Sequence, residues 1–175
     1  MSPDKRFDDI RPYTNDEIPA AMQRLAAEPM LDKVFSWFFP GQSSRNWRNM
    51  LRSVKSVTEL QERIMHPVIK IIIDKTMQGF TSSGEDYIPA DKGVLYISNH
   101  RDIVLDATLL MLVLSQQGYP TAEISFGSNL MQSQAIVDLG KSNKMYKVFR
   151  KSGNIRDLVK NSNLLSDYIR CRINS

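Results

Sequence analysis

The sequence has little cysteine and no long apolar run, and each absence excludes a class of protein. The 175 residues contain one cysteine, Cys171, so no disulfide can form within the chain and a reducing, cytoplasmic compartment is the simplest expectation. The longest apolar stretches, 64–73 and 103–114, are interrupted by ionisable residues, and both are shorter than the roughly 20 residues of a membrane-spanning helix. Residues 1–11 lack the apolar segment of an export signal. We therefore expect any membrane contact to be peripheral.

Glycine, proline and an excess of charge of one sign are also scarce. With 8 Gly, 8 Pro, 42% hydrophobic and 24% charged residues, the composition is that of a globular domain rather than a disordered chain. The 23 Lys and Arg exceed the 19 Asp and Glu by a formal charge of +4. This excess is too small for a nucleic-acid-binding module, but it suits an anionic substrate or membrane face. The length predicts one compact domain with a helical appendage.

The first 80 residues have the periodicity of helices. Thr14 and Glu17 form a capping-box pattern at the start of the first helix, and Pro67 marks a kink or a boundary in the last. Helices are predicted over residues 15–28, 30–39, from 43 or 44 onward, and 58–80. We expect this helical region, 1–80, to be distinct from the part that follows.

From Thr81 the pattern changes to short apolar runs that alternate with helical segments. Strands are predicted over 94–97, 123–126 and 146–149, and helices over 103–114, 132–139 and 154–172. Strands that alternate with helices are typical of a mostly parallel sheet flanked by helices, so the sequence predicts an α/β core over 81–175.

The third predicted helix is amphipathic and basic. Its apolar strip is formed by Trp47, Met50, Leu51 and Val54, and its cationic face by Arg45, Arg48, Arg52 and Lys55. On an anionic membrane each such cation would contribute about 1 kcal/mol, and the aromatic residues 37–39 could add an anchor. Alternatively the strip packs on the protein core and the cations face water, which is the commoner arrangement. Both interpretations stay open.

A histidine stands where the first predicted strand gives way to a helix. His100 lies at the carboxyl end of the run 94–97, the edge of a parallel sheet where ligand sites collect, with Asp102 and Asp106 close behind it. An imidazole can take a proton from a hydroxyl, while a carboxylate fixes its tautomer and stabilises the imidazolium. The alternative is a histidine that caps or packs.

These residues resemble the first motif of the glycerolipid acyltransferase family, to which the 1-acylglycerol-3-phosphate acyltransferases belong. The resemblance rests on Ile88-Pro89, the turn 91–93, the run 94–97 and the Asn99-His100 pair. In the family motif four residues separate the histidine from an aspartate, whereas five separate His100 from Asp106 here. Either the turn is one residue longer or Asp102 takes the place of the partner. We favour Asp106, and the resemblance implies that Asn99 and Arg101 contact substrate.

A second stretch is similar to the family's second motif, a strand that ends in Phe and a basic residue that helps to hold the acceptor's phosphate. It includes Phe149, Arg150, Lys151 and Arg156. Phosphate is bound well by cationic side chains, and best by the paired donors of arginine. Which of the three cations has this role stays open, and the alternative is a solvated basic turn.

The resemblance implies a glycerol-3-phosphate acyltransferase-like fold and an activity. A fatty acyl group would pass from acyl-CoA or acyl carrier protein to a lysophosphatidic-acid-like acceptor, with no cofactor, metal or nucleic acid involved, in the cytoplasm or at the inner face of the membrane. The family's third and fourth motifs are missing, so we expect a truncated chain with little activity of its own. The alternatives are a non-catalytic membrane-surface module that retains the fold, or an acyltransferase with another lipid acceptor.

Overall fold

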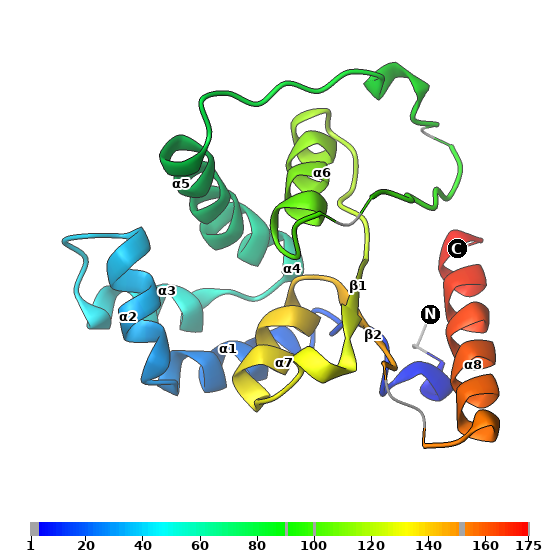
Figure 1. Cartoon of the computed structure of the whole chain (residues 1–175). Helices are drawn as coiled ribbons and strands as arrows, with labels where there is room; N and C mark the ends of the chain where they lie inside the picture. The colour runs from blue at the N-terminus through cyan, green and yellow to red at the C-terminus, as the bar shows by residue number, and fades with distance from the viewer. Residues whose placement is uncertain (1–3, 90, 100, 151–152, 175) are drawn as a thin grey trace.

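The computed structural model describes residues 4–89, 91–99, 101–150 and 153–174, and its first part is helical as the sequence predicts (Figure 1). The predicted helix over 58–80 ends earlier than expected, at Thr76, and it contains a π-helical segment, Gln61–Met65, directly before His66 and Pro67. Because Pro67 has no N–H to donate to the preceding turn, a wider turn at this position accommodates it. The helices are α1 (Ile18–Ala27), α2 (Met30–Phe38), α3 (Ser44–Ser53), α4 (Val57–Leu60) and α5 (His66–Thr76).

The apolar strip of α3 lies in the core of this helical part. Trp47 is only 2% exposed, and its ring stacks on Phe35 of α2 with ring centroids 4.4 Å apart. Arg48, on the cationic face, donates to the Asp32 carboxylate at 2.7 Å. The structure thus has the core-packing arrangement of the two that the sequence left open. Arg45, Arg52 and Lys55 face solvent.

The sheet has two parallel strands among the described residues, β1 (Ile124–Gly127) and β2 (Met145–Val148), in register from Ile124 opposite Met145 to Gly127 opposite Val148. Three helices surround it: α6 (Leu105–Gln116), α7 (Gln134–Ser142) and α8 (Ile155–Ile173). A small parallel sheet flanked by helices agrees with the α/β class. The outer edge of β2 is covered by the N-terminal segment, because the N–H of Lys147 donates to the carbonyl of Ile10 at 2.8 Å.

The predicted buried strand over 94–97 is absent, which corrects the sequence prediction. Residues 94–97 belong to the long connection between α5 and α6, and they are extended without a ladder partner. Leu95 is 55% exposed and Ile97 is 87% exposed. An extended segment becomes a buried strand only when a neighbour satisfies its backbone groups, and here a cavity separates it from β1.

An ion pair between a half-exposed arginine and a buried aspartate joins the helical part to α7. The Asp138 side chain is fully buried and accepts two hydrogen bonds from the Arg24 guanidinium, both at 2.8 Å. The Tyr13 hydroxyl at 3.0 Å and the Gln134 amide at 2.9 Å also donate to this carboxylate.

The division of the chain near residue 81 stays a prediction. Within the described ranges, no helix has the length and apolarity to cross a bilayer.

Candidate active site

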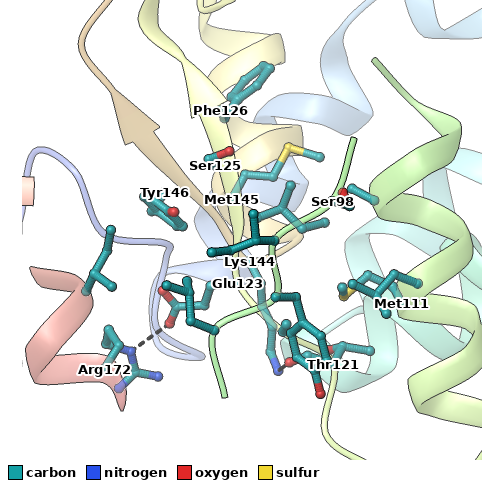
Figure 2. Close-up of a pocket in the computed structure, with 18 of the residues that line it drawn as sticks. Ser98, Met111, Thr121, Glu123, Ser125, Phe126, Lys144, Met145, Tyr146 and Arg172 are labelled. Atoms are coloured by element: carbon teal, nitrogen blue, oxygen red, sulfur yellow. Dashed lines mark hydrogen bonds and ion pairs between the residues drawn. The ribbon is translucent and has the colours of Figure 1, made fainter. Parts of the chain in front are cut away.

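A cavity of about 1250 Å³ lies alongside β1, between the extended connection and α8. Its walls come from the segment 92–98, the first turns of α6, both strands and the last turns of α8. Figure 2 shows side chains from these elements, Ser98, Met111, Met145 and Arg172 among them, around one space. The carboxyl ends of β1 and β2 contribute Gly127 and Arg150. This is the edge of a parallel sheet at which ligands bind in α/β proteins.

The turn that leads into α6 is held by its two aspartates. Asp106 Oδ2 accepts the N–H groups of Arg101 at 2.6 Å and of Asp102 at 2.9 Å. Asp102 Oδ1 accepts the N–H groups of Val104 and Leu105, both at 2.7 Å. The first amides of a helix have no partner within the helix and favour negative charge, so each aspartate stabilises this turn.

The candidate base lies outside the described residues, but the two residues that follow it do not. Arg101 and Asp102, directly after His100 in sequence, are held by the Asp106 carboxylate, and Asp106 lines the cavity. The predicted helix over 103–114 begins later, at Leu105, and residues 101–104 form the turn before it. Residues 101–104 thus connect the candidate base to α6, and the choice between Asp106 and Asp102 as its partner stays a prediction. Asn99 and Arg101 are exposed beside it.

The second motif lies at the carboxyl end of β2. Phe149 packs against the cluster of Phe7, Ile10 and Tyr168, and Arg150 lines the cavity. None of the ion pairs between described residues involves Arg150. Arg156 is exposed in the first turn of α8, and Lys151 lies outside the described residues.

Polar side chains that sequence reasoning missed gather at the other end of the cavity. Glu123, just before β1, accepts hydrogen bonds from the Tyr168 hydroxyl and from Arg172 Nε, the latter at 2.8 Å (Figure 2). Burial, with the neighbouring Glu123, raises the pKa of Tyr168. Burial also lowers the pKa of Lys144, whose Nζ donates to the Thr121 carbonyl at 2.7 Å. Because Tyr168 follows Glu123 by 45 positions in the sequence, no local spacing could have predicted this group.

These contacts fix α8 to the start of β1 and so hold one wall of the cavity in place. In the described part of the chain, no three His, Cys, Asp or Glu side chains are grouped so that they could hold a metal ion. The cavity offers instead an apolar interior, with the held turn at one border and an arginine at the strand ends. A site of this kind suits a ligand with an apolar chain and an anionic group.

Comparison with known families agrees with this geometry. The model of the Acyltransferase family matches residues 79–166, a range that contains the held turn, both strands and most of α8. Comparisons with curated proteins and with solved structures found no significant match. The matched range covers half of the chain, and the protein belongs to the Acyltransferase family.

Proposed function

We propose that this acyltransferase moves a fatty acyl group from acyl-CoA or acyl carrier protein to the hydroxyl of a lysophosphatidic-acid-like acceptor, in phospholipid biosynthesis. His100 is the base and Asp106 its partner, with Asp102 as the alternative. The observation that supports this most is that the Asp106 carboxylate accepts hydrogen bonds from the backbone N–H groups of Arg101 and Asp102. A carboxylate that already holds the residues after His100, at the border of a cavity, is well placed to orient a base there.

The proposed reaction is a direct displacement. The acceptor hydroxyl gives its proton to the His100 imidazole as its oxygen attacks the thioester carbonyl carbon. When the tetrahedral intermediate collapses, the carbon–sulfur bond breaks and the leaving thiolate takes the proton from the imidazolium. Asp106 stabilises the imidazolium, so its negative charge favours the transition state more than the ground state. Asn99 and Arg101 are proposed to contact the substrates beside the base.

The acceptor's phosphate is proposed to bind Arg150. This side chain is exposed at the carboxyl edge of the sheet, lines the cavity and forms none of the ion pairs between described residues. A guanidinium can give a phosphate two parallel hydrogen bonds, each about 1.5–3 kcal/mol when one partner is charged. Phe149 supports the same strand end from the core side. Arg156 and Lys151 are the alternatives.

Arg150→Ala tests the proposed acceptor. Acyl transfer is measured for the full-length protein with lysophosphatidic acid and with a monoacylglycerol that has the same chain but no phosphate. We expect the KM for lysophosphatidic acid to rise about tenfold or more, because a charge-assisted contact is lost, and the KM for monoacylglycerol to stay unchanged. Arg156→Ala tests the alternative, because a rise in the KM for lysophosphatidic acid in that variant alone would assign the phosphate contact to α8. If the wild-type protein uses both acceptors equally well, the phosphate-bearing acceptor is rejected.

We also propose that peripheral contact with an anionic membrane, if the acceptor is taken from one, uses α2 rather than α3. Met30, Val34 and Trp37 are exposed at helical spacing on one face of α2, and Trp37 is 53% exposed. Lys75 Nζ lies 4.2 Å from the centroid of the Trp37 ring, and Lys33 is exposed on the same helix. An exposed tryptophan beside lysines is typical of helices that lie at a membrane surface.

Trp37→Ala tests this contact by co-sedimentation with vesicles that contain anionic lipid. Burial of a large apolar side chain contributes about 1.5–3 kcal/mol to binding. Trp37→Ala removes this contribution, so vesicle binding should weaken about tenfold or more. Arg52→Glu, on the exposed face of α3, is the comparison. Loss of binding in Arg52→Glu with normal binding in Trp37→Ala would place the contact on α3 instead.

A further inference from the structure

Gly127, the last residue of β1, is not a glycine for reasons of backbone conformation. Its φ of −65° and ψ of 132° are ordinary extended values that any residue adopts. A Cβ at this position would lie 2.6 Å from Asn129 Oδ1, 3.2 Å from Arg150 Cγ and 3.3 Å from Arg150 Nε. The space above the Gly127 Cα is therefore occupied by the Arg150 and Asn129 side chains, and a side chain at residue 127 would compete for it.

The next residue of the same turn holds the Arg150 backbone. The N–H of Arg150 donates to Ser128 Oγ at 3.1 Å. This contact follows from the sheet register, because Gly127 stands opposite Val148 and the two chains leave the sheet side by side. The turn 127–129 thus contacts the Arg150 main chain through Ser128, and the missing side chain of Gly127 leaves room for the Arg150 side chain.

We propose that the turn 127–129 is a positioning element for Arg150, with Gly127 and Ser128 as the residues that set the direction of its guanidinium into the cavity. This inference rests on the proposed binding of the acceptor's phosphate by Arg150. The atoms that a methyl group at residue 127 would meet belong to two flexible side chains rather than to backbone. Gly127→Ala should therefore leave the fold intact, move the Asn129 amide and shift the Arg150 side chain by a few tenths of an ångström.

The test is equilibrium binding, which needs no turnover and can be done with the 175-residue chain. Octanoyl lysophosphatidic acid and mono-octanoylglycerol are titrated by calorimetry into the wild-type chain and into Gly127→Ala, Ser128→Ala, Ser128→Thr and Arg150→Ala. Gly79→Ala is the matched control, since a Cβ at Gly79 would meet no atom within 4 Å. Thermal unfolding of each variant checks that the fold is retained. Ser128→Ala gives a second reading if Gly127→Ala unfolds.

We expect Gly127→Ala and Ser128→Ala to weaken binding of the phosphate-bearing ligand by up to about tenfold, with the effect of Arg150→Ala as the upper limit, and to leave binding of mono-octanoylglycerol unchanged. Ser128→Thr keeps a hydroxyl and should bind as the wild-type chain does. If Arg150→Ala weakens binding of lysophosphatidic acid while Gly127→Ala and Ser128→Ala do not, the positioning role is wrong and the phosphate role of Arg150 stands. If the wild-type chain binds both ligands equally and Arg150→Ala changes neither, the phosphate site itself is wrong.

Discussion

His100→Ala should lower kcat for acyl transfer from acyl-CoA to lysophosphatidic acid by about 10³-fold, with little change in the KM of either substrate. A general base contributes roughly 10²–10⁴-fold to a proton-transfer step, and the other histidine of the sequence, His66, begins α5 instead of preceding α6. The loss should appear in kcat because, in the proposed mechanism, the imidazole takes the proton as the hydroxyl oxygen attacks, after both substrates are bound. Thiol release and phosphatidic acid formation, measured together on the full-length protein, report the effect.

The chain offers a matched control, because His66 is the other of its two histidines. It is partly buried at the start of α5, and His66→Ala should keep kcat within about twofold of the wild-type value. Asp106→Asn separates charge from positioning, since the amide oxygen of asparagine can still accept the N–H groups of Arg101 and Asp102. A fall of about tenfold or more in that variant would assign catalysis to the charge of Asp106. Undiminished activity in His100→Ala would reject the base assignment.

The helices were predictable because their signal is local. The 3.6-residue periodicity predicted the start of α3 and both ends of α8 to within one residue. Helix starts were harder: the capping-box pair at Thr14 and Glu17 does interact, with the Thr14 N–H donating to the Glu17 carboxylate at 2.7 Å, yet α1 begins at Ile18. Glu17 also binds Arg11, which lowers its pKa to about 2. Arg11 lies in the segment before α1, outside the helix. The periodicity of the helix therefore could not predict its contact with Glu17.

The strands were predictable only where a partner exists. Residues 124–127 and 145–148 form the sheet within one residue of the predicted ranges, whereas 94–97, with an equally apolar pattern, remains unpaired. An apolar run shows that a segment can be buried, but the ladder that makes it a strand depends on residues far away in sequence. The pattern could not reveal that the connection would lie across a cavity from β1.

In the candidate site, too, local features could be predicted from the sequence and contacts between distant residues could not. The spacing of His100, Asp102 and Asp106 pointed to one turn, and the two described members of this set do hold that turn together. The contacts that place Arg150 could not be predicted, because Ser128 lies 22 residues before it and Gly127 looks like any glycine after a strand. A motif can name candidate residues, but a contact such as that of Ser128 with Arg150 forms only when the sheet brings two strand ends together.

Arg24→Ala should lower the stability of the protein strongly, because it leaves the buried carboxylate of Asp138 without its cationic partner. The Asp138 side chain is fully buried, and without Arg24 its remaining donors among the described residues are the neutral groups of Tyr13 and Gln134. Breaking a buried pair from one side costs about 3–5 kcal/mol, and because the Arg24 side chain is about half exposed we expect the lower end. For a chain of this size about 3 kcal/mol corresponds to a fall in Tm of about 6–12 °C.

Thermal unfolding can then tell whether the buried charge causes this loss. Adding Asp138→Asn to Arg24→Ala replaces the unpaired carboxylate with a neutral amide, whose burial costs less free energy. The Tm of the double variant should therefore be higher than that of Arg24→Ala. Arg6→Ala is the control, because it breaks an ion pair with Asp4 in which both side chains are exposed, and its Tm should stay near the wild-type value. A further fall in the double variant would show that lost packing, rather than an uncompensated charge, makes Arg24 important. The recovery would instead mean that Arg24 holds the helical part against α7 by neutralising one buried carboxylate.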